Sequence, residues 1–280
     1  MHARSALFDV YGDHLRSRGN QAPVAALVRL LAPVGIGAPA VRTAVSRMVS
    51  QGWLTPVTLQ VGPGYRATDE AVRRLADTAD RVYRRGTPAW DGRWRLAFVD
   101  APRDRSARTR LRAELGFLGL AEYAPGVWVT PWPRDVRPAV ERAGGSLRTA
   151  VAETFDVDPA GAWDLPSLGS AYADWAAAAD RLVDTELRRH EDEDEAMFAA
   201  RFHLVHEWRK FLFADPGLPD DLLPGDWPGR AAADLFADPG LPTDLLPERW
   251  PGRVAEDLFH DEATRLEPGA TRFLVRCLAG

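Results

Sequence analysis

The sequence predicts an α+β protein with an N-terminal winged helix-turn-helix, a central ferredoxin-like domain and a helical C-terminal domain. Three observations predict it. Helical periodicity followed by a hairpin pattern fills residues 1–86, an alternation of strand and helix patterns fills residues 87–160, and helical patterns dominate residues 161–280. A length of 280 residues also suits two or three domains.

The first 86 residues contain three successive helical patterns. Their apolar positions, spaced three or four residues apart, are Leu7, Val10, Tyr11 and Leu15, then Val24, Leu27, Val28 and Leu31, then Ala38, Val41, Ala44, Val45, Met48 and Val49. Two β-rich runs follow, separated by Gly62 to Gly64, which predicts a two-stranded wing with its tight turn at these glycines. Residues 68–86 predict a closing helix.

The central segment alternates between strand and helix. A strand is predicted in WRLAFVDAP, a helix in RSARTRLRAELGFLGL and one or two strands in EYAPGVWVTPW. A helix in RDVRPAVERAGG and a strand in LRTAVAETFDV complete the segment. The order β-α-β-β-α-β is that of the ferredoxin-like split βαβ unit.

The C-terminal segment predicts long helices, together with an internal duplication. Residues 212–234 are repeated in residues 235–257 with 18 of 23 positions identical. Two copies are too few for a solenoid, which needs about three units to bury a continuous core. We interpret the repeat as a tandem duplication of a connector, in which a rigid loop leads into a short helix, rather than as a binding repeat.

Composition and charge restrict the class of protein. The sequence contains no apolar run near the roughly 20 residues of a membrane span and no signal-peptide pattern, and its single cysteine, Cys277, excludes a disulfide framework, so a cytoplasmic protein is expected. Residues 1–134 hold 20 Arg against 11 acidic residues, whereas residues 135–280 carry a net charge of −14. The basic first half suits a polyanionic partner such as DNA.

Four polar residues occupy the other face of the third predicted helix: Arg42, Thr43, Ser46 and Arg47. Arginine can donate a forked pair of hydrogen bonds to guanine, and the short hydroxyl side chains can bond bases or phosphates. Tyr65 and Arg66 of the predicted wing could reach neighbouring phosphates. The alternative is that these residues only keep a core helix soluble, or that the domain binds protein.

Five arginines cluster at the start of the first central helix, among them Arg103, Arg105 and Arg108. A helix N-terminus favours anions, so these residues are candidate contacts for a phosphate of DNA or of a ligand. A solvated helix face whose arginines pair with nearby acids explains the cluster equally well.

Catalytic and metal-binding patterns are weak. Asp100 ends the first central strand, where a carboxylate could hold a metal for phosphodiester cleavage, but no second carboxylate accompanies it in that strand. His203, His206 and Glu207 share a helix without the two-histidine arrangement of zinc proteases, which favours structural histidines. No P-loop, GxGxxG or GxSxG motif is present, so no catalytic residue, metal or cofactor is predicted.

Three blocks in order resemble the PaaX-type transcriptional repressors of phenylacetic acid catabolism: LLAPVGIGAPAVRTAVSRMVSQGWL, WDGRWRLAFVDAPRDRSARTRLRAELGFLGLAEYAPGVWVTP and FHLVHEWRKFLFADPGLPDDLLPGDWPG. The resemblance implies a non-enzymatic, dimeric repressor that binds palindromic double-stranded operator DNA and is released by an aryl-CoA thioester such as phenylacetyl-CoA. This chain departs from the family in carrying the LPDDLLPGDWPG block in two copies. The alternative functions are a metal-dependent nuclease and a protein-interaction scaffold.

Overall fold

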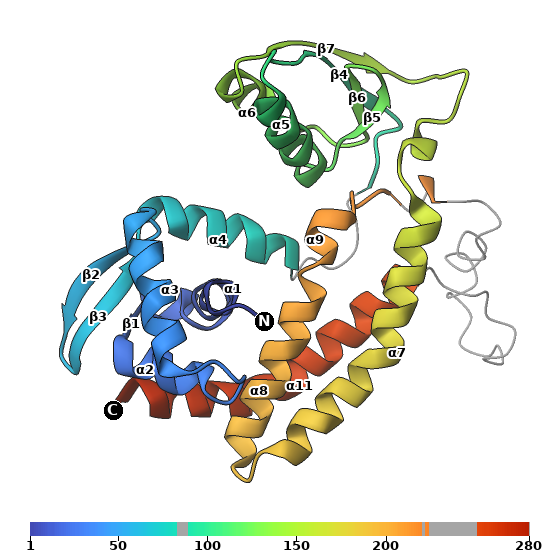
Figure 1. The fold of residues 1–280 in the computed structure, drawn as a ribbon. Helices are drawn as coiled ribbons and strands as arrows, with labels where there is room; N and C mark the ends of the chain where they lie inside the picture. Colours follow the sequence, from blue (N-terminus) through green and yellow to red (C-terminus); the bar gives the residue numbers. More distant parts are fainter. Residues whose placement is uncertain (83–88, 220–221, 224–250, 280) are drawn as a thin grey trace, which may run out of the picture. The chain divides into compact units, whose positions relative to one another are not determined.

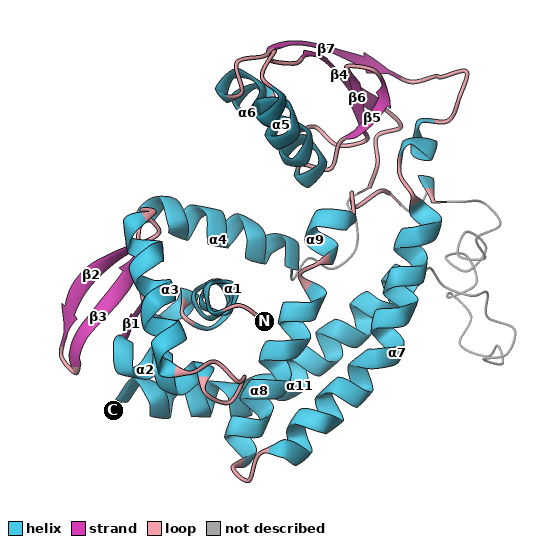
Figure 2. Cartoon of the chain, in the orientation of Figure 1, coloured by secondary structure: helices cyan, strands magenta, loops and turns pink. Residues whose placement is uncertain are grey.

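The computed structural model describes residues 1–82, 89–219, 222–223 and 251–279, and has the mixed helix and sheet composition expected (Figure 2). The chain divides into two compact units. One comprises residues 1–84, 174–210 and 255–280, and the other comprises residues 85–173 and 211–254. The C-terminal part of the chain therefore contributes to the same unit as the N-terminal part.

The first unit begins with three α-helices, α1 (Ala3–Asp9), α2 (Val24–Leu31) and α3 (Ala38–Ser50) (Figure 1). The first predicted helix is split, because α1 passes into a π-helical turn, η1 (Val10–His14), before the 3₁₀ turn η2 (Arg16–Arg18). The second and third predicted helices agree with α2 and α3. All three helices contribute buried apolar residues to one hydrophobic core.

A small antiparallel sheet accompanies these helices, in the strand order β1-β3-β2. Its strands are β1 (Gln21–Pro23), β2 (Leu54–Leu59) and β3 (Gly62–Ala67), and α4 (Asp69–Val82) follows. The prediction of a turn at Gly62 to Gly64 is wrong, since Leu59 pairs with Gly62 and the turn lies at residues 60–61. Gly64 is needed for another reason: a Cβ there would lie 2.6 Å from the carbonyl oxygen of Ala22 in β1.

Three long helices supply the C-terminal part of this unit: α8 (Glu193–Trp208), α11 (Pro251–Ala279) and the second half of α7 (Leu165–Arg189). An aromatic cluster joins them, in which Trp208 of α8 stacks on Phe259 of α11 with ring centroids 4.7 Å apart, and Trp175 of α7 lies 4.9 Å from Trp208. The helical C-terminal segment predicted from sequence is therefore present in the described residues.

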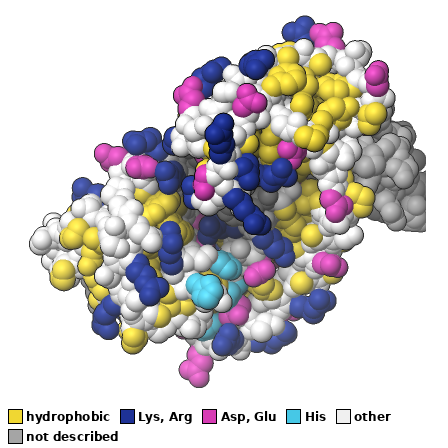
Figure 3. Space-filling model, turned by 45° about the horizontal axis from the view of Figure 1, so that its top comes forward, with side chains coloured by type: hydrophobic (Ala, Val, Ile, Leu, Met, Phe, Trp, Pro, Cys, Tyr) yellow, Lys and Arg dark blue, Asp and Glu magenta, His cyan; other side chains and the backbone are white. Residues whose placement is uncertain are grey.

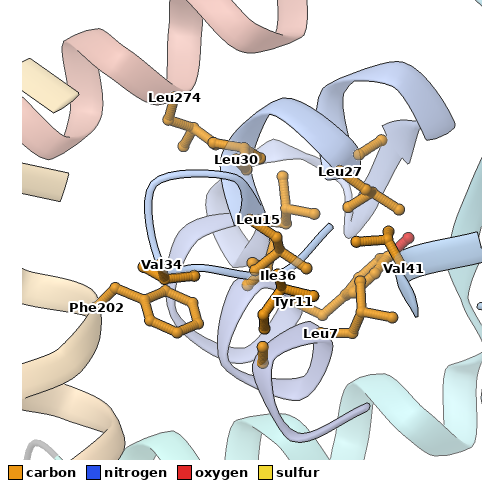
Figure 4. Packing of buried hydrophobic residues seen from close by; sticks show 14 of the residues in the cluster. Leu7, Tyr11, Leu15, Leu27, Leu30, Val34, Ile36, Val41, Phe202 and Leu274 are labelled. Atoms are coloured by element: carbon orange, nitrogen blue, oxygen red, sulfur yellow. The ribbon is translucent and has the colours of Figure 1, made fainter. Parts of the chain in front are cut away.

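The core under α1 to α3 is completed by α8 and α11. Phe198, Phe202, Phe273 and Leu274 are buried in the same cluster as the apolar residues of the N-terminal helices. Figure 4 shows Leu30 of α2 beside Leu274 and Val34 beside Phe202. Arg29 of α2 also donates a hydrogen bond to the main-chain oxygen of Cys277 in α11. The N-terminal helices therefore do not bury their apolar surface by themselves.

The second unit contains a four-stranded antiparallel sheet in the order β5-β6-β4-β7. Its elements follow along the chain as β4 (Trp94–Asp100), α5 (Arg105–Phe117), β5 (Ala121–Ala124), β6 (Val127–Thr130), α6 (Arg137–Arg142) and β7 (Ser146–Ala152), with η3 (Pro159–Ala162) and α9 (Phe211–Ala214) later. Ala97 and Val99 of β4 pack against Leu111 and Leu115 of α5, so the helices cover one face of the sheet. Trp94 and Val129 form a second cluster with Ala160 of η3.

Most of the duplicated segment, residues 224–250 with the short helix predicted in the first copy, lies outside the described residues, whereas in the second copy residues 251–257 begin the long helix α11 rather than a short one. The described parts of the duplication are residues 212–219 and 222–223 of the first copy and residues 251–257 of the second. Within the residues that the structure describes, none of the helices combines the length and the apolar character that crossing a membrane requires.

Buried charged groups connect the N-terminal helices to α8. Asp9 of α1 is 3% exposed and pairs with Arg209, and its Oδ2 atom lies 2.7 Å from Nδ1 of His206. Asp13 of η1 pairs with Arg201. Buried carboxylates need such partners, because an unpaired buried charge is strongly destabilising. These ion pairs therefore give the buried carboxylates of α1 and η1 cationic partners in α8 and at its end.

Shortening Leu274 to Ala should destabilise the N-terminal helices, although they are more than 200 residues away in the sequence. The side chain is 2% exposed and packs in the shared core, so we expect a loss of about 2 to 5 kcal/mol in the free energy of unfolding, measured by urea denaturation. Hydrogen exchange at the amides of α3 should accelerate as well. The control is Val275→Ala at the neighbouring position, which is 44% exposed and should change stability by about 0.5 kcal/mol or less. Equal effects of the two variants would contradict the shared core.

Stability should fall as the pH drops below 6.5, because His14 is buried as a neutral ring against Phe198. Burial lowers the pKa of His14 from 6.5 to about 4, so in this interval the unfolded chain binds more protons than the folded chain. The free energy of unfolding should decrease by at most about 1.4 kcal/mol per pH unit through this group.

Urea denaturation between pH 6.5 and pH 5 measures this slope. His14→Gln should make it shallower, whereas His2→Gln, at an exposed position, should leave it unchanged. A slope in His14→Gln equal to that of the unsubstituted protein would show that another group carries the pH dependence.

Candidate DNA-binding surface

Helix α3 is held in place by its apolar side. Val41, Ala44, Val45 and Met48 are all buried in the core of the first unit. The helix begins after Gly37, with Pro39 in its first turn, where a missing N–H costs nothing. The connection from α2 turns at Gly35, whose φ of 78° is readily adopted only by glycine. A short connection from α2 and the buried apolar side therefore position α3 on the core of the first unit.

The opposite side of α3 is exposed to solvent, and it contains the four residues predicted to read bases. Arg42, Thr43, Ser46 and Arg47 are all exposed. In the described part of the chain, no hydrogen bond or ion pair joins the guanidinium group of Arg42 or Arg47 to another residue. The two guanidinium groups are thus available to a ligand, and the structure brings all four predicted residues to one helix face.

Tyr65 and Arg66 lie within β3 rather than at the tip of the hairpin. Tyr65 packs partly buried against the core, and its carbonyl oxygen accepts a hydrogen bond of 3.0 Å from the hydroxyl of Tyr11. Burial raises the pKa of that Tyr11 hydroxyl. The backbone of Tyr65 is therefore anchored to η1, which fixes the hairpin relative to the helices.

Arg66 is exposed, and its guanidinium group donates two hydrogen bonds, of 2.6 and 3.0 Å, to the side-chain oxygen of Gln21 in β1. This holds the cation in one orientation on the outer surface of the sheet. Sequence reasoning missed Gln21, because a three-residue strand has no periodicity to reveal it. The tip of the hairpin carries no cation, since it consists of Gln60 and the 54% exposed Val61.

The arginine cluster of the second unit surrounds a helix N-terminus that already has an acidic cap. Asp104 accepts a 2.6 Å hydrogen bond from the amide of Ala107, and this bond together with the Ser106 hydroxyl holds the pKa of Asp104 below its usual value. Arg108 donates to the carbonyl oxygens of Pro102 and Arg103. Arg103 and Arg105 are exposed. Of the three predicted contacts, Arg108 is the one that the surrounding backbone orients.

The residues considered for catalysis or metal binding each contact another side chain. Asp100 accepts a hydrogen bond of 3.0 Å from the hydroxyl of Ser146. His203 lies 3.8 Å from Glu186, and His206 contacts Asp9, so the two histidines face different acidic partners at helix packing positions. Figure 3 shows histidine side chains gathered at one place on the visible face, beside acidic side chains. No cluster of three metal-ligating side chains occurs among the residues that are described.

Comparison with known proteins covers nearly the whole chain. Residues 2–71 match the model of the PaaX-like protein family, residues 87–162 match the PaaX protein central Cas2-like domain, and residues 163–238 and 235–276 match the PaaX-like protein C-terminal domain. The two matches to the C-terminal domain correspond to the two copies of the duplicated segment.

Two relatives illustrate the similarity. The chain is 28% identical over 253 residues, 82% of this chain and 77% of the relative, to a protein described as transcriptional repressor PaaX of Escherichia coli strain K12. A solved structure described as the uncharacterised protein Rv0674 from Mycobacterium tuberculosis matches with a TM-score of 0.56 and 26% identity, over 97% of this chain and 98% of the other. These matches confirm the resemblance seen in the sequence: the chain belongs to the PaaX family.

Proposed function

We propose that the protein is a dimeric, ligand-responsive transcriptional repressor that binds palindromic operator DNA. The observation that carries the proposal is the two-sided character of α3, in which Val41, Ala44, Val45 and Met48 are buried and the opposite face presents Arg42 and Arg47 without intramolecular partners among the described residues. Membership of a family that includes a transcriptional repressor supports it.

The proposal assigns a role to each part of the chain. Residues 1–86 act as a winged helix-turn-helix, with α3 as the reading helix and the β2–β3 hairpin as the wing. Residues 87–160 form a ferredoxin-like domain, which the strand order β5-β6-β4-β7 supports. Residues 161–280 supply the helical part of the chain, which receives the effector signal. The proposal includes no enzymatic activity.

Base reading would fall to the outward face of α3. Arg42 and Arg47 would each donate a forked pair of hydrogen bonds to guanine in the major groove, and Ser46 would bond a base or a phosphate. Arg66, held by Gln21, and Tyr65 would support the complex from the wing at the sugar-phosphate backbone. Dimerisation would place two such helices at half-sites one helical turn or more apart.

Release by an aryl-CoA thioester requires a connection between the C-terminal helices and α3. The shared core supplies one, since Phe202 of α8 and Leu274 of α11 pack in the same cluster as the residues beneath α3. A thioester that shifts α8 or α11 would change the packing beneath α3 and therefore the position of this helix. Arg103, Arg105 and Arg108 are the candidate contacts for its phosphates, and the acidic cap Asp104 among them limits how closely an anion can approach the helix end.

Replacing either arginine of the reading face should weaken operator binding selectively. An operator is first selected from a random DNA pool, and its affinity is then measured by fluorescence anisotropy. Arg42→Ala and Arg47→Ala should each cost about 1 to 3 kcal/mol of binding free energy. The matched control is Arg188→Ala on α7, an exposed arginine in the acidic half of the chain, which should leave affinity unchanged.

Three outcomes would contradict the proposal. Unchanged operator affinity in both Arg42→Ala and Arg47→Ala would remove α3 from the interface. An absence of DNA binding at low salt would favour the protein-interaction alternative, because a DNA-binding surface loses affinity steeply as salt rises. Cleavage of RNA or DNA in the presence of Mg²⁺ or Mn²⁺, abolished by Asp100→Asn, would favour the nuclease alternative.

Phenylacetyl-CoA should raise the dissociation constant of the operator complex, and coupling of about 5- to 150-fold is usual for an allosteric ligand. The coupling is reciprocal, so operator DNA must lower the affinity for the thioester by the same factor. Titrating the thioester with and without operator, together with sedimentation of the free protein to test for a dimer, measures both parts. Equal operator affinity in the presence of phenylacetyl-CoA and of CoA alone would exclude this effector.

A further inference from the structure

The two hydroxyl side chains on the outward face of α3 differ in their hydrogen bonding. The Thr43 hydroxyl donates a hydrogen bond of 2.9 Å to the carbonyl oxygen of Pro39, one turn earlier in the same helix. Ser46 makes no such bond to any residue that the structure describes. The two residues therefore offer different groups to a DNA groove, although their side chains look alike in the sequence.

The bond to Pro39 uses the hydroxyl proton of Thr43. A threonine on a helix can satisfy its hydroxyl by this return to the carbonyl four residues earlier, and its branched Cβ holds the side chain in that rotamer. The oxygen then lies against the backbone of the first turn. The hydroxyl has no second proton to donate, so the γ-methyl group and the acceptor lone pairs of the oxygen are what this exposed side chain offers to a ligand.

The surroundings of Thr43 on this side of the helix are apolar. Pro39 and Ala40 are both exposed, and they lie four and three residues before Thr43, so the three residues share one face of the first turns. Arg42, Ser46 and Arg47 make the following part of the surface polar. The reading face thus divides into an apolar N-terminal part and a polar, cationic part.

We propose that Thr43 reads a thymine in the operator by contact between its γ-methyl group and the 5-methyl group of the base, with Ala40 beside it. The inference rests on the proposed DNA-binding function and adds a specificity to it. The N-terminal residues of a reading helix contact base edges in the major groove, and the thymine methyl is the apolar group displayed there. The Thr43 hydroxyl donates no hydrogen bond to a base in this arrangement, because its proton is donated to Pro39.

Two conservative substitutions separate the methyl group from the hydroxyl group. Thr43→Val keeps the branched shape and the methyl but removes the hydroxyl, whereas Thr43→Ser keeps the hydroxyl and its bond to Pro39 but removes the methyl. The position is exposed, so thermal unfolding should stay the same in both variants. The DNA probe is the operator selected from a random pool, together with duplexes in which each thymine in turn is replaced by deoxyuridine, which lacks only the methyl group.

In each half-site, replacing one particular thymine with deoxyuridine should weaken binding by the unsubstituted protein about fourfold relative to the unmodified operator. This factor corresponds to the loss of one buried methyl contact. Thr43→Val should keep both the operator affinity and this sensitivity. Thr43→Ser should bind the operator about fourfold more weakly and lose the sensitivity at that position alone. Ser46→Ala is the matched control, because it should lower affinity and still distinguish thymine from deoxyuridine.

The opposite pattern would overturn the inference. Weak binding by Thr43→Val with normal binding by Thr43→Ser would mean that the hydroxyl forms a hydrogen bond with DNA, and indifference of the unsubstituted protein to every deoxyuridine duplex would mean that no thymine methyl is read. In both cases the protein still binds its operator, so the proposed function stands. Failure of the selection to yield any bound sequence would overturn the proposed function and this inference together.

Discussion

The packing of α8 and α11 against the N-terminal helices is the constraint on which the first unit depends. Helices α1, α2 and α3 are short, and their buried residues share one core with Phe198, Phe202 and Leu274 of the C-terminal helices. Short amphipathic helices gain most of their stability from tertiary packing rather than from intrinsic propensity. The surface that presents Arg42 and Arg47 is therefore held by residues that come from both ends of the chain.

Buried ion pairs give that packing a defined register. Separating Asp9 from Arg209 or Asp13 from Arg201 would leave a buried charge without its partner, which is far more costly than a small shift between apolar side chains. The hydroxyl of Tyr11 in η1 donates a hydrogen bond to the carbonyl oxygen of Tyr65 in β3, which connects the hairpin to the same group of helices. These contacts connect α8 and its end to α1 and η1, and η1 to the hairpin.

Much of the candidate surface could be predicted from local sequence. The spacing of Val41, Ala44, Val45 and Met48 establishes which side of α3 is buried, and Arg42 and Arg47 then follow on the exposed side by helical geometry. The position of the hairpin turn could not be predicted in the same way. Gly62 to Gly64 resemble a turn, but Gly64 is required by the close approach of β1, a strand with no recognisable pattern of its own.

The sequence by itself determined the helical faces, the order of strands and helices in residues 87–160 and the family to which the chain belongs, because these depend on neighbouring residues or on motifs read in order. The tertiary structure alone decided which groups have partners. Gln21 holds Arg66, Arg209 neutralises Asp9, and the backbone of Pro39 occupies the hydroxyl of Thr43. The first two interactions join residues that are far apart in the chain, and the third depends on the rotamer of the threonine side chain. Neither periodicity nor composition therefore predicts them.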